Sequence, residues 1–270
     1  MFNPRHLRNM CSSARALHLN LADTGRWLWS YYSSRLPGAG ARIRGGRLVQ
    51  IAVRDEAGRR HRAFIRNNGR DWGGVEEIFL RRAYRVDLAD VHCILDLGGN
   101  IGLATLALAG SFPGAQICTV EPVPDNLAVL RRNVESCRPP VRVVAGAVGA
   151  ADGQAFLHLS EDPQQHSLDA AVCPTGAAIT VDVFSVPSLM ALMAWDHIDL
   201  LKIDIEGGEK YVLGGQPPWL SNVRCIVGEG HTGAGYTIDV CRRDLEPAGF
   251  EVQEVDRGEG AMTFLARRRQ

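Results

Sequence analysis

The sequence predicts an α/β protein built on a mostly parallel sheet with helices on both faces. From Val91 onward, short continuous apolar segments alternate with longer segments of helical periodicity. Strands of a parallel sheet are buried on both sides and are joined by long crossovers, usually helices, which is the pattern seen here. A chain of 270 residues with 46% hydrophobic content is long enough for one such domain and an accessory segment.

Residues 1–90 are expected to form a cap or substrate region. Apolar residues recur with helical spacing over residues 4–36, which predicts an amphipathic helix that Gly25 could interrupt. We expect its apolar stripe to pack on the chain's own core; a dimer interface or a lid is the alternative. Two alternating segments, 47–53 and 60–65, predict a β-hairpin, and a helix capped by Asp71 is expected to follow.

Residues 91–270 are expected to form the catalytic domain. The strands expected in its sheet are 91–97, 116–121, 141–148, 198–205, 223–229, 251–256 and 262–268. The last two are expected to form a closing hairpin after a helix that ends near Gly249. Between Gly149 and Met193 the order is open, with strand candidates at 154–160 and 178–184 around a loop.

Composition excludes several classes of protein. The net charge is zero, from 30 basic and 30 acidic residues, so no overall field would attract nucleic acid or an anionic membrane. No apolar segment reaches the roughly 18 residues of a membrane span. The 7 cysteines are odd in number and never spaced as CxxC, which argues against a disulfide framework or a zinc knuckle and favours the reducing cytoplasm.

The segment LDLGGNIG, Leu95 to Gly102, lies where the first strand of the sheet turns into a helix, a place where open α/β sheets bind ligands. A nicotinamide fingerprint starting at Gly98 would need glycines where Asn100 and Leu103 stand. S-adenosylmethionine (SAM) carries no phosphate, and its site favours an acid before the turn and another that accepts the ribose hydroxyls. Asp96 precedes the turn, and Glu121 ends the second strand at the expected spacing for a ribose ligand.

These segments and four others resemble the FkbM family of SAM-dependent methyltransferases. The resemblance covers Arg70 to about Gln253 and rests on RDWGGVEEIFLRRAY, ILDLGGNIG, VEPVPDNLAVLRRNV, GAVGAADG, LLKIDIEGGEKYVL and IVGEGH, in the family's order. It implies the class I Rossmann-like methyltransferase fold with a seven-stranded sheet. It also implies O-methylation of a hydroxyl on a sugar, polyketide, glycolipid or other natural product.

Carried over by position, the resemblance implies a SAM site in three parts. The glycine turn is expected to hold the cofactor, Glu121 and Pro122 to lie at its ribose, and backbone atoms near the adenine to come from the end of 141–148. The expected cofactor residues are Asp96, Gly98, Gly99, Asn100, Gly102, Glu121, Pro122, Gly146 and Ala147. In GEGH this chain has a glycine before Glu229 where relatives carry an apolar residue, so we expect a loosened strand end.

Methylation of an alcohol by in-line displacement benefits from a base for the hydroxyl proton. Strand alternation in KIDIEGGE is expected to point Lys202, Asp204 and Glu206 to one side, with Lys202 compensating the acids and Glu209 starting the next helix. His231 is expected to be the base. The expected catalytic residues are His231, Asp204, Glu206 and Glu229; alternatively, Asp204, Glu229 and His231 hold Mg²⁺.

Other functions compete with this interpretation. N-methylation by the same fold and a SAM-binding protein without catalysis remain open. Asp204-Ile205-Glu206 stands where enzymes acting on exocyclic base amines carry an Asn or Asp followed by Pro-Pro, which argues against a DNA base amine. We expect a small-molecule hydroxyl acceptor as partner, no nucleic acid or membrane, and a homodimer through the N-terminal helix as an alternative state.

Overall fold

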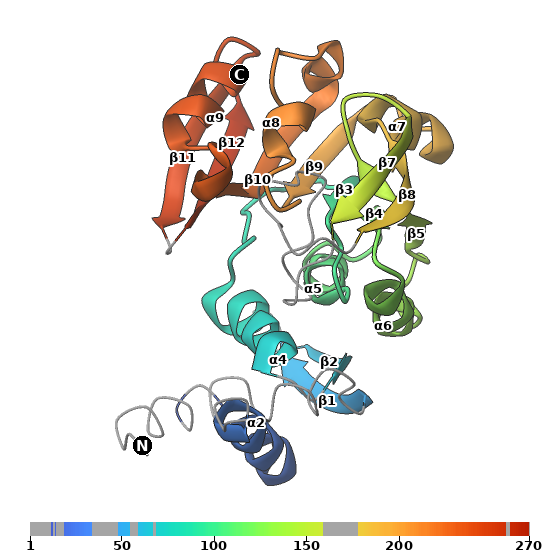
Figure 1. Cartoon of the computed structure of the whole chain (residues 1–270), viewed down its shortest axis with the longest axis vertical. Helices are drawn as coiled ribbons and strands as arrows, with labels where there is room; N and C mark the ends of the chain where they lie inside the picture. Colours follow the sequence, from blue (N-terminus) through green and yellow to red (C-terminus); the bar gives the residue numbers. More distant parts are fainter. Residues whose placement is uncertain are drawn as a thin grey trace.

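The computed structural model describes residues 12, 14, 19–33, 48–54, 59–66, 69–158, 178–257 and 260–269. A seven-stranded sheet forms its centre (Figure 1). Most of residues 4–18 and residues 34–36 of the predicted N-terminal helix lie outside the described residues, as does the whole loop expected between the strand candidates 154–160 and 178–184. The class of fold predicted from the alternating apolar segments is confirmed.

The sheet has the strand order β11-β12-β10-β9-β3-β4-β5. Every pair of neighbours is parallel except those of β12, which runs antiparallel to both β10 and β11. In chain order the strands are β3 (Cys93–Leu97), β4 (Gln116–Glu121), β5 (Arg142–Ala145), β9 (Ile198–Ile203), β10 (Val223–His231), β11 (Phe250–Arg257) and β12 (Ala261–Arg268). A strand is present at each of the seven predicted places, although the segment predicted as 141–148 stays in this sheet only as far as Ala145.

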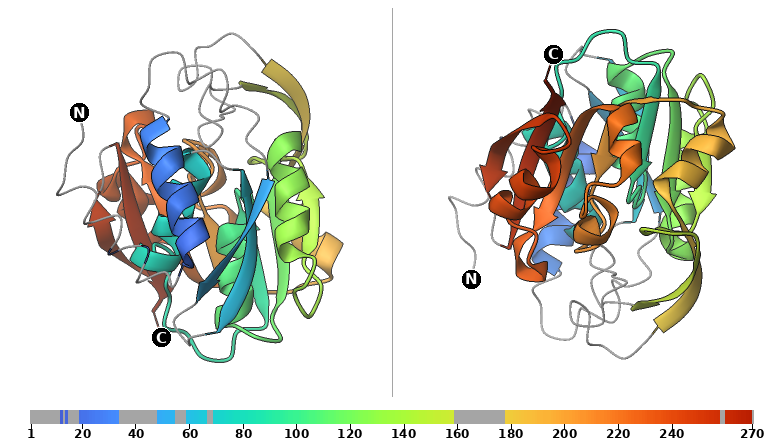
Figure 2. Two further views of the ribbon diagram at one scale, coloured as in Figure 1. Left: turned by 90° about the horizontal axis from the view of Figure 1, so that it is seen from below. Right: turned by 90° about the horizontal axis from the view of Figure 1, so that it is seen from above.

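Helices cover both faces of this sheet (Figures 1 and 2). On one face lie α5 (Leu103–Ser111) and α6 (Pro124–Val134), and on the other α7 (Val186–Met193), α8 (Glu209–Val212) and α9 (Ile238–Leu245), with short 3₁₀ turns at Pro218–Asn222 and Thr232–Ala234. Local residues set the helix starts. The side chains of Ser185 and Thr237 accept the backbone N–H groups of Ser188 and Val240 as N-caps of α7 and α9.

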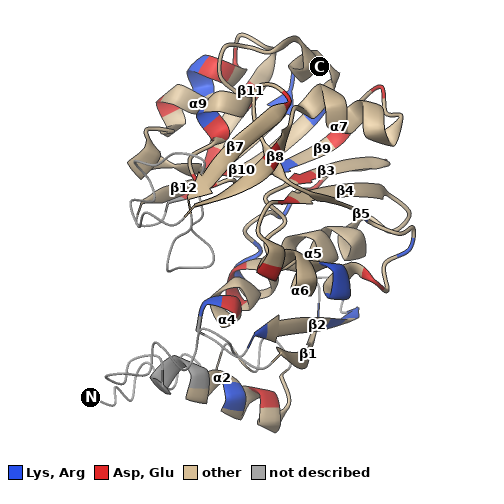
Figure 3. Cartoon of the chain, turned by 45° about the vertical axis from the view of Figure 1, so that its right-hand side comes forward, with Lys and Arg blue, Asp and Glu red and all other residues tan. Residues whose placement is uncertain are grey.

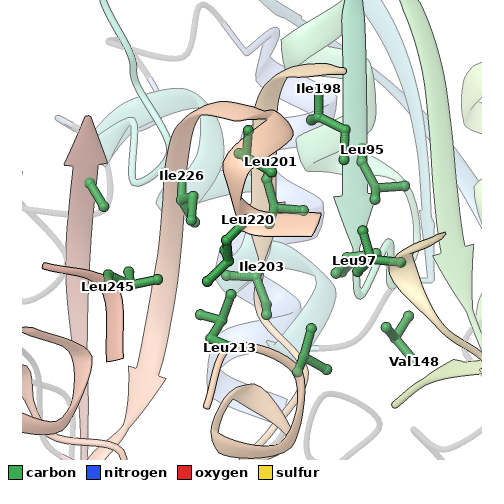
Figure 4. Close-up of a cluster of buried hydrophobic side chains, with 14 of the residues drawn as sticks. Leu95, Leu97, Val148, Ile198, Leu201, Ile203, Leu213, Leu220, Ile226 and Leu245 are labelled. Atoms are coloured by element: carbon green, nitrogen blue, oxygen red, sulfur yellow. The ribbon is translucent and has the colours of Figure 1, made fainter. Parts of the chain in front are cut away.

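The core lies where α7, α8 and α9 meet the centre of the sheet. Strand β9 is buried along its whole length. Figure 4 shows Leu97 of β3 beside Ile203 of β9. It also shows Leu201 of β9 between Leu95 of β3 and Ile226 of β10, and all five side chains are fully buried. Burying each such side chain contributes about 1.5–3 kcal/mol, so these strands hold the loops at their ends in fixed positions.

A second, three-stranded sheet packs beside the first and contains β6 (Ala147–Val148), β8 (Ala178–Phe184) and β7 (Gly153–His158). The expected single strand 141–148 is therefore wrong, because the chain leaves the main sheet at Gly146. A Cβ there would lie 2.6 Å from the Phe184 ring and 2.8 Å from the Asp182 carbonyl oxygen. Glycine at this position lets the chain pass close to β8.

The N-terminal region contributes α2 (Leu21–Ser33) and a hairpin of β1 (Leu48–Arg54) and β2 (Arg60–Arg66), which confirms the hairpin. Helix α2 continues through Gly25, so the expected break does not occur. Its Trp27 is buried and stacks on Trp72 with ring centroids 5.8 Å apart. The buried face of α2 thus packs on the chain itself.

The helix expected after the hairpin changes type partway. It starts as α4 (Gly69–Val75) and continues as a π-helix, η1 (Glu76–Arg81). Asp71 lies inside the first turn and is not its cap; instead its carboxylate accepts the backbone N–H of Arg66 and pairs with the Arg66 guanidinium at 3.0 Å. π-Helical turns often occur at functional sites, and η1 borders the pocket described below.

Charges of both signs are mixed over the helices, as α4 and α9 show in Figure 3. Within the described ranges, no helix is long and apolar enough to cross a membrane. The five cysteines in these ranges are free thiols: Cys93, Cys118, Cys137, Cys225 and Cys241.

Candidate functional site

A pocket of about 360 Å³ opens at the carboxyl ends of β3, β4, β9 and β10. The described residues bring together most of the predicted site here. Of the predicted residues, Gly98, Asn100, Glu121, Pro122, Gly146, Ala147, Asp204, Glu206, Glu229 and His231 line it. This pocket is therefore the candidate active site.

The glycine turn after β3 packs tightly on its neighbours. Gly98 has a φ of +81°, and a Cβ there would lie 1.8 Å from the Asp204 carbonyl oxygen, so only glycine fits. The N–H groups of Gly98 and Gly99 both donate to the Val120 carbonyl, at 3.1 and 2.9 Å. Gly99 and Gly102 stand behind the pocket wall, where they permit close packing against Thr119 and Leu130.

Asp96 does not reach the pocket, contrary to expectation. Its side chain is fully buried, accepts the hydroxyls of Thr105 and Thr119, and has Oδ1 at 3.2 Å from Lys202 Nζ. Strand alternation points this carboxylate beneath the glycine turn, where it pairs with Lys202 of the neighbouring strand.

Lys202 compensates the charge of Asp204, as predicted, but its nearest acid is Asp96, which was not predicted as a partner. Its ammonium pairs with Asp96, donates to the Gly98 carbonyl at 2.7 Å and lies farther, 3.9 Å, from Asp204 Oδ2. Burial alone would lower the Lys202 pKa, but the charges of Asp96 and Asp204 outweigh it and raise that pKa. Because β9 ends at Ile203, alternation stops there: Asp204 and Glu206 turn into the pocket and Lys202 remains beneath it.

The carboxylate of Glu121 is held rigidly at the end of β4. Oε2 accepts the N–H of Asn100 at 2.9 Å, while Oε1 accepts the Val123 N–H at 3.0 Å and the Asn126 amide at 3.2 Å. Burial raises the pKa of Glu121, and these hydrogen bonds oppose the rise. Beside it in the wall, the buried Oδ1 of Asn100 accepts no hydrogen bond from any of the described residues.

His231 lies between two carboxylates at the other end of the pocket. Its Nε2 is 3.1 Å from Glu206 Oε2, and its Nδ1 is 3.1 Å from Glu209 Oε1. Burial alone would lower the pKa of His231, but hydrogen bonds and charges of both glutamates outweigh it and raise the pKa to about 12. This direction favours the imidazolium at neutral pH, whereas a base needs the neutral imidazole, so the role of His231 as the base stays a prediction that this geometry does not favour.

Glu209 begins α8, as predicted, and its side chain also holds the preceding turn and His231 in place. Its side chain is fully buried and accepts the backbone N–H of Ile205 at 3.0 Å in addition to contacting His231. It thereby fixes the turn that carries Glu206. Glu206 itself has a φ of +52°, a strained conformation for a non-glycine residue that functional sites often retain.

The extra glycines around Glu229 do not loosen β10, contrary to expectation. The strand stays paired with β12 as far as His231 and Ala261. A Cβ at Gly228 would lie 2.5 Å from the Ile203 carbonyl oxygen, so this glycine permits close packing. Burial raises the Glu229 pKa to about 8, with the charges of Asp204 and Glu77 adding to the effect.

Sequence reasoning missed Glu77, which lines the pocket, and Tyr84, which lies behind it and contacts the pocket residue Asp204. Glu77 of η1 lines the pocket, and burial together with the Asp204 charge raises its pKa. The Tyr84 hydroxyl donates to Asp204 Oδ2 at 2.9 Å and lies 3.5 Å from Glu229 Oε2. Both belong to the segment RDWGGVEEIFLRRAY, whose position in the motif series was the available signal.

The predicted divalent-metal ligands are only partly gathered. Donor atoms of Asp204, Glu209 and His231 lie within 4.8 Å of one another, with Glu209 in the place predicted for Glu229. Both ring nitrogens of His231 already face carboxylate oxygens. A metal ligand must be a neutral imidazole, so this arrangement favours a proton on His231.

Comparison with models of protein families identifies one match: the model of the Methyltransferase FkbM domain matches residues 96–267 of this chain. Among curated relatives, 31-O-demethyl-FK506 methyltransferase FkbM of Streptomyces tacrolimicus is 27% identical over 66% of this chain and 86% of its own. Methyltransferase sdnD of Sordaria araneosa is 28% identical over 72% and 88%. Methyltransferase 1 of Beauveria bassiana is 29% identical over 52% of this chain but only 65% of its own.

The fold also has a solved counterpart. The crystal structure of Methyltransferase FkbM from Methylobacillus flagellatus KT superposes with a TM-score of 0.51 and 16% identity, covering 70% of this chain and 47% of that one. The chain thus spans less than two thirds of the Beauveria relative and about half of the solved protein. Since the family domain covers well over half of the sequence, the chain belongs to the FkbM family of SAM-dependent methyltransferases.

Proposed function

We propose that this chain transfers a methyl group from SAM to a hydroxyl of a small-molecule acceptor, such as a sugar, polyketide, glycolipid or other natural product. One observation carries the proposal: a single pocket has the fixed carboxylate of Glu121 at one end and a group of carboxylates around His231 at the other. The Streptomyces relative is named for methylation at an oxygen, which supports an oxygen acceptor here.

The pocket residues fit the parts of SAM. Glu121 would accept hydrogen bonds from the ribose hydroxyls. The Oδ1 atom of Asn100, which has no donor among the described residues, offers a further acceptor in the same wall. Backbone atoms of Gly146 and Ala147 would lie next to the adenine of SAM, as the family resemblance implies. When bound, SAM supplies a methyl group on a positively charged sulfur. The excess of acids over bases in this pocket would stabilise that charge.

We assign the hydroxyl proton to Glu206 rather than to His231. Because the two carboxylates raise the pKa of His231 and favour a proton on it, the next proton that this pair accepts would go to the Glu206 carboxylate. Burial raises the Glu206 pKa to about 7, although its hydrogen bond with His231 opposes the rise. A base whose pKa lies near the operating pH is effective. SAM, when bound, would supply the methyl group to the hydroxyl oxygen and leave as neutral S-adenosylhomocysteine, while Glu206 would take the hydroxyl proton.

Transfer of labelled methyl from SAM to a panel of sugars, polyketide alcohols and amines tests the proposal. We expect label on a hydroxyl and loss of turnover in Glu206→Gln with SAM affinity retained. Glu135→Gln, at an exposed position outside the pocket, is the matched control. Label found solely on amines would instead support N-methylation. SAM binding without transfer to any acceptor would support a non-catalytic binding protein.

The Mg²⁺ alternative makes a separate prediction. If a divalent ion activated the hydroxyl, exhaustive chelation would abolish transfer and added Mg²⁺ would restore it. We expect turnover to survive chelation because both His231 nitrogens face carboxylates.

A further inference from the structure

A second group of side chains with metal-ligand chemistry lies at the amino ends of β3 and β9, the end of the sheet opposite the pocket. Cys93 begins β3, His197 directly precedes β9, and Asp199 is the second residue of β9. These strands are adjacent and parallel, with Ile94 beside Leu200. The three residues therefore meet at the amino ends of the strands, whereas the methyl-transfer pocket lies at the carboxyl ends.

The three donor atoms are close enough to share one ion. The Cys93 sulfur, a His197 ring nitrogen and an Asp199 carboxylate oxygen all lie within 4.8 Å of one another. His197 Nε2 is 3.7 Å from Asp199 Oδ2, which is too long for a hydrogen bond. Two ligands of a tetrahedral zinc ion lie about 3.4 Å apart, so this separation suits a shared metal better than a direct contact.

Two of these ligands are already oriented. The Oδ2 atom of Asp199 accepts the backbone N–H groups of His92 and Cys93, at 2.8 and 3.0 Å. His197 Nδ1 lies 2.6 Å from Asp196 Oδ1, which leaves Nε2 to face Asp199. A histidine that ligates a metal usually donates its other ring N–H to a carboxylate in this way.

The local charges also balance around a divalent ion. The Cys93 thiolate, Asp199 and Asp196 would supply three negative charges. Arg224 Nη1, 3.6 Å from Asp199 Oδ1, supplies one positive charge, and a divalent ion would supply the other two. Thiolate, imidazole and carboxylate together favour Zn²⁺ over Mg²⁺ or Ca²⁺, which prefer oxygen ligands alone.

We propose that Cys93, His197 and Asp199 form a zinc-type metal site that ties the start of β3 to the start of β9. A water molecule would complete the coordination, since only three protein ligands converge among the described residues. Metal binding to the folded chain alone would raise its melting temperature by linkage. This site is independent of the methyl-transfer proposal.

Titration of the tag-free full chain with Co²⁺ tests the site, because cobalt replaces zinc and reports thiolate ligation through a charge-transfer absorption band. We expect one equivalent to bind with that band and Zn²⁺ to displace it. Cys93→Ser should lose the band, and both Cys93→Ser and His197→Ala should weaken binding at least about tenfold.

Two controls locate the site. His92→Ala removes an exposed neighbouring imidazole but keeps the backbone N–H that Asp199 accepts, so binding should be unchanged. His231→Ala should also leave the band intact, which separates this site from the pocket. Absence of a thiolate band in the native chain, undiminished binding in Cys93→Ser, or equal weakening in His92→Ala would each overturn the proposal. His197 is exposed, so His197→Ala decides the matter even if Cys93→Ser fails to fold.

Discussion

Replacing Lys202 by Met should destabilise the protein strongly, because it would leave the Asp96 carboxylate buried without its counter-ion. Both side chains are essentially inaccessible, at 2% exposure for Lys202 and 0% for Asp96, and their charged atoms are 3.2 Å apart. Removing one member of a buried ion pair costs about 3–5 kcal/mol. We expect about 3 kcal/mol, since the hydroxyls of Thr105 and Thr119 still donate to Asp96.

Urea unfolding followed by tryptophan fluorescence measures this cost, and a double-mutant cycle assigns it to the pair. Asp96→Asn in the Lys202→Met background should recover part of the lost free energy, because the uncompensated charge is gone. Lys210→Met is the matched control and should cost less than about 1 kcal/mol, since Lys210 is only partly buried. A cost for Lys202→Met as small as that of the control, or no coupling with Asp96, would refute the reasoning.

Three further predictions concern the pocket. Glu121→Ala should weaken SAM binding by about 1–3 kcal/mol in calorimetry, since the ribose hydroxyls lose charge-assisted hydrogen bonds; unchanged affinity would mean that the ribose acid is misassigned. Tyr84→Phe removes the hydroxyl that donates to Asp204 and should lower kcat while leaving SAM affinity intact; a lower melting temperature with unchanged kcat would limit Tyr84 to a structural role. Turnover should rise through about pH 7 as Glu206 ionises, and Glu206→Gln should remove this rise.

The stability of the fold should depend on pH through the same carboxyl. The Glu206 pKa is higher in the folded chain, about 7, than the ordinary value of 4.5. Between these pH values the folded state keeps a proton that the unfolded state releases, so the free energy of unfolding should fall as the pH rises. Urea titrations at pH 5 and 7, compared with Glu206→Gln, measure this contribution; an equal pH dependence in the variant would contradict it.

The architecture was readable from the sequence because buried parallel strands are continuously apolar. The sequence did not reveal the positions where one close backbone contact determines the course of the chain. Gly146 ends β5 because β8, which is distant in sequence, approaches it closely. The π-helix at Glu76–Arg81 likewise gives no periodic signal of its own.

The sequence predicted which residues lie in the pocket better than it predicted their protonation and their contacts. Motif order placed Glu121, Asp204 and His231 in one pocket, because loops at the carboxyl ends of neighbouring strands meet there. The sequence could not show that His231 lies between Glu206 and Glu209, which reverses its expected protonation. A pKa depends on distances and burial, and these follow from tertiary packing.

Calorimetric titration of the full chain with S-adenosylhomocysteine, the demethylated cofactor, and with NAD tests the central claim most directly. The account predicts one site per chain for the demethylated cofactor, weakened by Glu121→Ala, and no binding of NAD, since Asn100 and Leu103 replace glycines of the nicotinamide fingerprint. Binding of NAD with no binding of S-adenosylhomocysteine or SAM would contradict it.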